Sequence, residues 1–160
     1  MDKKTSAVIQ KVHELFRAKN LTLSAAESCT GGLISHYLTA LPGASSFFLA
    51  GIVTYSVAAK ANFIGVSSNV MKKHGMVSRE TAEEMAEKVR SAAGSDFSVA
   101  TTGNLGPDVL EGKERGLVFL AVSGKGRTSS RELHLTGNRT ENKKEASLGA
   151  LRFLIEMVER

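Results

Sequence analysis

Segments with the apolar spacing of helices alternate with short apolar segments typical of strands along most of this chain. The spacing predicts helices over residues 6–20, 31–40 and 67–74, a helix capped by Ser78, and a last helix opening at Thr140. Strands are expected over residues 21–26, 47–55, 96–102, 116–123 and 130–135. This alternation indicates an α/β fold whose sheet is covered by helices on both faces. The late hairpin predicts a mixed sheet.

The size and composition indicate one soluble domain over residues 1–160. Apolar residues make up 42% of the chain, and no apolar run is long enough to cross a membrane. The first residues lack the apolar block of a signal peptide, so we expect a cytoplasmic protein. The four histidines are scattered and there is one cysteine, so we expect neither a metal site nor a disulfide.

The net charge is +5, and six Lys or Arg residues fall between Lys125 and Lys144. This basic stretch is either a solvated face or an attraction site for an anionic ligand such as a phosphate. It contains no interleaved aromatic residues and no recognised motif, so nucleic acid is not an expected partner.

The stretch AESCTGG, residues 26–32, joins an expected strand to an expected helix and raises three alternatives. Small residues before a helix N-terminus can hold an anion on backbone N–H groups. Cys29 could instead be a nucleophile, although no base lies close to it in the sequence. The third alternative is a tight structural turn.

Three more stretches place polar residues near the ends of expected elements. Ser45 precedes a strand, and Tyr55 and Lys60 follow it; a desolvated lysine can serve a serine as a base. ATTGNLGPD, residues 100–108, ends another strand, and LTGNR ends at Arg139, which could hold a phosphate. From the residues alone, each stretch could equally be an ordinary turn or loop.

In this order, AESCTGG, PGASSFF, GIVTYSVAAK, FIGV, HGMVS, TTGNLGP and LTGNR resemble the C-terminal domain of the CinA (competence/damage-inducible) proteins. The resemblance runs from about Leu21 to Arg160. That family includes the nicotinamide mononucleotide deamidases. The resemblance implies a three-layer α/β/α fold and an amidohydrolase that converts nicotinamide mononucleotide to nicotinate mononucleotide and ammonia. It implies no metal, no cofactor, and a homo-oligomer, with a dimer favoured.

Residue by residue, the resemblance implies that Ser45 is the nucleophile, Lys60 its base and Tyr55 a supporting residue. The residues that it implies for substrate binding are Ser28, Thr30, Gly31, Gly32, Thr102, Gly103 and Arg139. On this interpretation Cys29 is a packing residue.

Two stretches depart from the family pattern. Val57 stands where the family has asparagine, and the loop GNLGPDVLEGKERG lacks the usual glycine cluster. Asp108 and Glu111 add negative charge to that loop. The altered loop motivates a second hypothesis, a non-catalytic nucleotide-binding module of the same fold.

Overall fold

One five-stranded sheet in the order β2-β1-β3-β4-β5 forms the centre of the computed structural model, which describes residues 1–160. The strands are β1 (Leu23–Glu27), β2 (Phe48–Val53), β3 (Phe97–Gly103), β4 (Leu117–Gly124) and β5 (Arg127–His134). β1 pairs in parallel with β2 and β3, whereas β4 runs antiparallel to β3 and β5. The sheet is therefore mixed, as the hairpin predicts.

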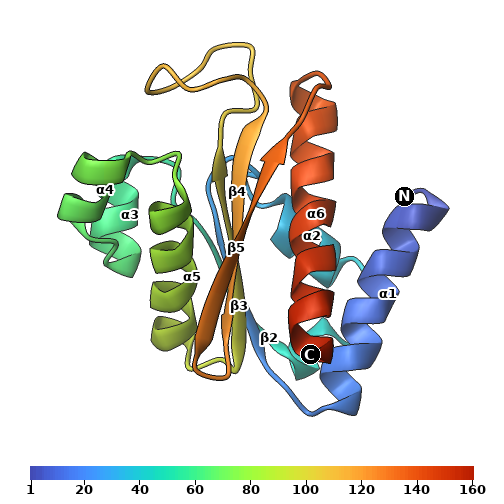
Figure 1. Ribbon diagram of the computed structural model, residues 1–160. Helices are drawn as coiled ribbons and strands as arrows, with labels where there is room; N and C mark the ends of the chain where they lie inside the picture. The colour runs from blue at the N-terminus through green and yellow to red at the C-terminus, as the bar shows by residue number, and fades with distance from the viewer.

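Helices cover both faces of this sheet (Figure 1). On one face lie α1 (Lys3–Ala18), α2 (Leu33–Thr39) and α6 (Arg139–Glu159), and on the other α3 (Val57–Ile64), α4 (Ser68–His74) and α5 (Arg79–Ala93). Each face has its own apolar core, with Phe16, Leu120 and Leu151 in one and Met85 and Ala86 in the other. The expected α/β/α sandwich is confirmed.

Side-chain caps explain where several helices begin. Ser67 and Ser78 accept hydrogen bonds from the N–H groups of Val70 and Thr81, so the helix starts read from the sequence at these serines are confirmed. The first helix begins three residues earlier than expected because Asp2 caps it. No helix of the structure is long and apolar enough to cross a membrane.

The sequence patterns did not predict α3. Ser56 caps it by accepting from the Ala59 N–H, and Gly65 ends it in the left-handed conformation. The helix has only eight residues, of which Lys60 and Ile64 are buried, so its apolar periodicity is too short to detect. The helix matters for the candidate site because it directs the Lys60 side chain toward the protein interior.

The carboxyl ends of β1, β2 and β3 meet at one end of the sheet, since these three strands are parallel. The loop after β1, the turn between β2 and α3, and the loop between β3 and β4 therefore gather there. The last of these extends well beyond the sheet (Figure 1). In open α/β sheets this is where ligands bind.

Candidate active site

A buried carboxylate organises the loop that follows β1. Glu27 is fully buried and accepts from the backbone N–H groups of Gly32, Ile34 and Ser35, at 2.8 to 3.1 Å. It also accepts from the hydroxyls of Thr30 and Ser35, at 2.7 and 2.8 Å. Five donors thus satisfy the charge that burial would otherwise penalise.

This arrangement decides one question raised by AESCTGG. The N–H groups at the start of α2 already bind Glu27, so they do not form a free cradle for a substrate anion. Gly31 and Gly32 adopt positive φ angles of 57° and 94°, which lets the chain turn sharply into α2. Thr30 is fully buried and holds Glu27 and Thr101, so in this structure it supports the loop.

Lys60 carries a buried amine at the same end of the sheet. Its residue is 1% exposed, and its Nζ lies 2.9 Å from the Ser28 Oγ and 2.7 Å from the Thr54 carbonyl oxygen. Burial lowers the pKa of this amine from 10.5 to about 8. A substantial neutral fraction near pH 8 makes Lys60 a competent general base, and the group within its reach is Ser28.

Burial has the opposite effect on the reactivity of Cys29: it makes the thiol a poor nucleophile. The residue is 6% exposed, and burial raises the pKa of its thiol to about 12. A thiol in that state carries almost no thiolate at neutral pH. The structure therefore argues against a cysteine nucleophile, and Cys29 packs in the larger core.

Ser45 lies at the other end of β2. It belongs to a 3-10 turn, Ala44–Ser46, that precedes the strand, and its exposed side chain makes no hydrogen bond. Lys60 binds Thr54, which directly follows the strand. Six strand residues at about 3.3 Å each separate the two positions by roughly 16 to 20 Å. The expected direct contact between Ser45 and Lys60 is therefore not formed within one chain.

A pocket of about 200 Å³ opens beside the Ser28–Cys29 loop. The side chains of Tyr55 and Arg139 meet at its edge, where an Arg139 N–H donates to the Tyr55 Oη at 2.8 Å. A second Arg139 N–H donates to the Gly106 carbonyl at 2.7 Å. Lys143, one helical turn further along α6, reaches toward Gly31. Arg139 thus lines the pocket, and Lys143 lies on the same helix face beside the loop that follows β1.

The loop between β3 and β4 forms the remaining wall. Gly103 lines the pocket and packs so closely on β4 that a Cβ would lie 2.6 Å from the Leu117 carbonyl oxygen. Thr102 is buried and donates to the Met76 carbonyl at 2.7 Å, so its hydroxyl does not face the pocket. The Asn104 side chain bonds Leu110 and Lys113 across the loop.

Two acidic residues of this loop, Asp108 and Glu111, point in different directions. Asp108 lines the pocket, together with Leu105 and Leu110. Glu111 points away and accepts from the N–H groups of Met76 and Val77, which fixes the loop to the segment before α5.

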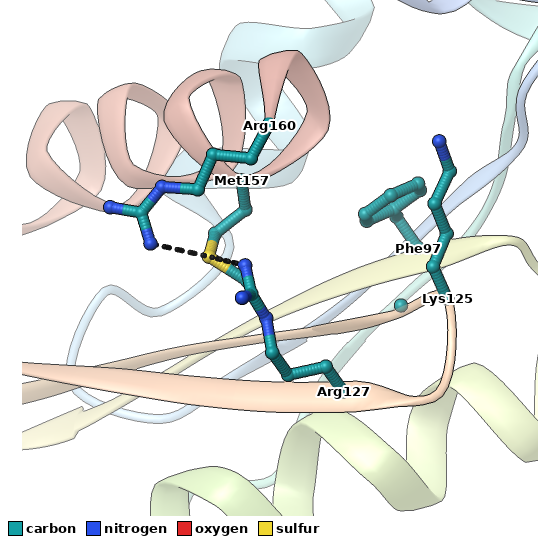
Figure 2. Close-up of a pocket in the computed structure, with 6 residues that line it drawn as sticks. Phe97, Lys125, Arg127, Met157 and Arg160 are labelled. Carbon is teal, nitrogen blue, oxygen red and sulfur yellow. Dashed lines mark hydrogen bonds between the residues drawn. The ribbon is translucent and has the colours of Figure 1, made fainter.

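Another pocket, of about 260 Å³, lies at the opposite end of the sheet (Figure 2). Arg127 and Arg160 converge on the Met157 sulfur there, and Lys125 extends beside Phe97. No serine, cysteine or carboxylate lines it. This pocket therefore offers no hydroxyl or thiol nucleophile.

Comparison with known proteins identifies the family of this chain and agrees with its fold. The family model of the CinA C-terminal domain matches residues 5–158. This chain belongs to the CinA C-terminal domain family. A CinA-like protein of Chloroherpeton thalassium is 39% identical over 154 residues. The chain spans 37% of that relative's length, and also 37% of a Bacillus subtilis relative that is 36% identical over 155 residues.

Solved CinA-family structures share the whole fold of this domain. The competence damage-inducible protein A of Klebsiella pneumoniae superposes with a TM-score of 0.95 at 30% identity, covering 98% of both chains. A competence/damage inducible protein of Agrobacterium tumefaciens gives a TM-score of 0.94 at 33% identity, covering 100% of this chain and 98% of that one.

Sequence reasoning missed several residues that build the CinA-domain site. Glu27 stood inside the motif AESCTGG, and a lone acidic residue at the end of an apolar strand is a signal for a buried, fully bonded carboxylate. The Thr54 carbonyl and the Asn104 side chain carried no comparable signal, since their roles depend on how the loops close.

Proposed function

We propose that this domain hydrolyses the carboxamide of a nicotinamide nucleotide, with Ser28 as the nucleophile and Lys60 as the general base. The observation that carries the proposal is the 2.9 Å contact between the Lys60 Nζ and the Ser28 Oγ. It matches the geometry required of a nucleophile and its base. The nucleophile is thus assigned to the serine that Lys60 reaches, in place of Ser45.

The reaction follows from the two protonation states of Lys60. Neutral Lys60 donates to the Thr54 carbonyl and accepts the Ser28 proton, while Oγ forms a bond to the carboxamide carbon. The resulting ammonium returns a proton to the leaving nitrogen, and ammonia departs from an acyl-serine. Water then adds to the ester as Lys60 takes its proton and returns it to Oγ, which releases the acid.

Backbone N–H groups next to Ser28 are available to stabilise the oxyanion. The N–H groups of Cys29 and Thr30 make no backbone hydrogen bond, although Ser28, Gly31 and Gly32 N–H groups are all engaged. One good oxyanion donor contributes about 3 to 4 kcal/mol to the transition state. The buried Thr54 hydroxyl also lacks a partner within the chain, so it is free to bind a water or the substrate.

Two cations support a phosphorylated substrate. Arg139 uses two of its five N–H donors within the chain, and Lys143 forms no ion pair. Arg139 lines the pocket beside the Ser28–Cys29 loop, and Lys143 reaches toward Gly31 of the same loop, so together they can hold a phosphate while the carboxamide reaches the serine.

The proposal is tested by ammonia release from nicotinamide mononucleotide. The wild-type protein should release ammonia, and Ser28→Ala should lower kcat by about a thousandfold or more, as expected for loss of a nucleophile. Ser24→Ala removes a buried serine within β1 and serves as the matched control, because Ser24 contacts Ser95 at the far end of the strand. Full activity of Ser28→Ala would refute the assignment.

A non-catalytic nucleotide-binding module is the second candidate. The observation that favours it is Asp108, which brings a negative charge into the pocket that Arg139 borders. This candidate predicts saturable binding of the nucleotide in calorimetry with no ammonia release. Turnover that depends on Ser28 would exclude it.

A further inference from the structure

The pocket at the far end of the sheet from Ser28 gathers positive charge that the proposed function does not use. Its volume is about 260 Å³, and three of its lining residues are Lys125, Arg127 and Arg160. None of these three cations forms an ion pair within the chain. Like charges that line one pocket repel each other unless an anion lies between them. The pocket therefore favours a negatively charged occupant.

Two guanidinium groups of this pocket meet at one neutral atom. Arg127 on β5 and Arg160 after α6 approach the Met157 sulfur, with N···S distances of 3.5 and 4.0 Å (Figure 2). A thioether is a weak acceptor, and each guanidinium has five N–H donors. Both groups therefore keep most of their donors free, and paired guanidinium groups can bind a phosphate through forked contacts.

Carboxylates on the neighbouring elements are already bound elsewhere. Glu156 on α6 forms a forked pair with Arg131, at 3.1 and 2.6 Å, and Glu159 pairs with a lysine of α1. Asp96, at the start of β3, accepts from the N–H and the hydroxyl of Thr22, both at 2.8 Å. No side-chain carboxylate lines the pocket, so its cations have no internal partner there.

The turn between β4 and β5 places Lys125 at this pocket in an unfavourable backbone conformation. The turn consists of Lys125 and Gly126, whose φ angles are both positive, at 49° and 73°. Two-residue turns of this type favour asparagine followed by glycine, because most other side chains are strained at positive φ. The Lys125 ammonium lies 5.9 Å from the centre of the Phe97 ring, which also lines the pocket. Strained residues of this kind cluster at functional sites.

We propose that this pocket is a second anion site, which binds a di- or triphosphate group. Three cations match the charge of an extended phosphate chain better than that of a single orthophosphate, and the volume holds more than one phosphate group. The Phe97 ring is 1% exposed and Lys125 lies over it, so the ring is not available to stack on a base. The pocket thus recognises the phosphate chain itself, whether it belongs to a nucleotide or to inorganic polyphosphate. This site does not depend on the proposed amidase function.

Titration of the full chain, followed by ¹H–¹⁵N NMR, tests the site residue by residue. Inorganic triphosphate should shift the amide signals of Gly124 and Gly126 along a saturable curve, because these glycines flank Lys125. The signal of Gly103 reports binding in the other pocket and separates the two sites. Shifts that are absent or do not saturate at Gly124 and Gly126 would overturn the proposal.

A comparison of three anions tests what the site recognises. A nucleoside triphosphate should bind within about twofold of inorganic triphosphate, since no side chain of the pocket is available for the base. Orthophosphate should bind about tenfold more weakly or worse, because it meets fewer of the cations. Orthophosphate binding as tight as that of triphosphate, or a nucleoside triphosphate that binds more than about tenfold tighter than the inorganic one, would overturn recognition of the phosphate chain.

Two matched variants separate this site from the general charge of the protein. Arg127→Gln should weaken triphosphate binding by about tenfold or more, as expected for loss of charged hydrogen bonds. Lys73→Gln removes the same charge from an exposed position on α4 and should leave the affinity unchanged. Equal losses in the two variants, or no loss in Arg127→Gln, would overturn the site.

Lys125→Asn should have opposite effects on stability and binding. Asparagine suits the positive φ of this turn, so Tm should rise by about 2 to 4 °C. Triphosphate affinity should fall by about three- to tenfold, because one of the three cations is lost. A more stable variant with unchanged affinity would show that Lys125 serves only the turn, and would overturn the three-cation site.

Discussion

The buried amine of Lys60 on α3 lies 2.9 Å from the hydroxyl of Ser28, which directly follows β1. The two residues are 32 positions apart in the sequence and meet because β1 and β2 are parallel neighbours whose following segments turn toward one another. Burial gives the amine its lowered pKa, and the same burial keeps water from competing for it. Position and basicity thus have one structural cause.

The pH dependence of the reaction should follow Lys60. Only the neutral amine can accept a proton, and its pKa is about 8 instead of 10.5. Activity should therefore rise about tenfold per pH unit below pH 8 and level off above it. A profile of kcat/KM from about pH 6 to 9.5 measures this. An activity that is flat or falling across the acidic half of that range would contradict a lysine base.

The free energy of unfolding should also depend on the protonation of Lys60. The folded pKa of Lys60 lies below its unfolded value, so between about pH 8 and 10.5 the unfolded chain binds more protons and the wild type gains stability as pH rises. Lys60→Met removes the buried charge, and its stability advantage over the wild type should be largest near neutral pH and shrink toward pH 10. Urea unfolding at several pH values measures the difference.

Lys73→Met is the control for that comparison, since Lys73 is exposed on α4. Its stability relative to the wild type should not change with pH over this window. If both methionine variants gave the same pH trend, the effect would not come from burial of Lys60.

The thiol of Cys29 should be inert in the folded protein. Its pKa of about 12 leaves almost no thiolate at pH 8, and the side chain is buried. Iodoacetamide should therefore fail to modify the native chain and should modify it in urea, as mass spectrometry can follow. Cys29→Ala should retain most of its ammonia release. Loss of activity upon alkylation of native protein would revive the cysteine alternative.

Arg139 should act on binding of the phosphate more than on chemistry. Arg139→Lys keeps the charge but cannot make the forked contacts to Gly106 and Tyr55, so we expect KM to rise about tenfold with a smaller change in kcat. The substrate without phosphate, nicotinamide riboside, separates the two effects. If the variant lost as much with the riboside as with the nucleotide, Arg139 would not bind the phosphate.

Tyr55→Phe is the companion variant, because it removes only the oxygen that accepts from Arg139. It should raise KM less than Arg139→Lys, since the contact with Gly106 and the full guanidinium remain. An equal effect of both variants would mean that the tyrosine hydroxyl acts on its own.

The sequence predicted the architecture of this domain better than its site. Periodic segments and caps such as Ser78 are local signals, so the order of most helices and strands followed from them. Helix α3 gave no such signal, and with it the inward direction of Lys60 could not be predicted. The choice between Ser28 and Ser45 depends on which end of β2 faces the lysine, which is a matter of strand order and not of spacing along the chain.

Motif matching also left the role of Glu27 unresolved. AESCTGG resembles a ligand loop because of its small residues, yet its helix N–H groups serve the carboxylate within the same motif. A motif identifies which residues occur together but does not say which of them bind each other. That distinction requires side-chain positions.

Because Glu27 occupies the electropositive end of α2, the loop that carries Ser28 has its shape before any substrate arrives, and it has no remaining helix-end donors with which to select one. In the proposed amidase, substrate selection falls to Arg139, Lys143 and the loop between β3 and β4, which belong to other parts of the chain. The proposal thus divides bond cleavage and substrate choice between separate segments. It follows from the proposal that changes in residues 103–116 should alter the substrate range while the Ser28 and Lys60 geometry stays intact.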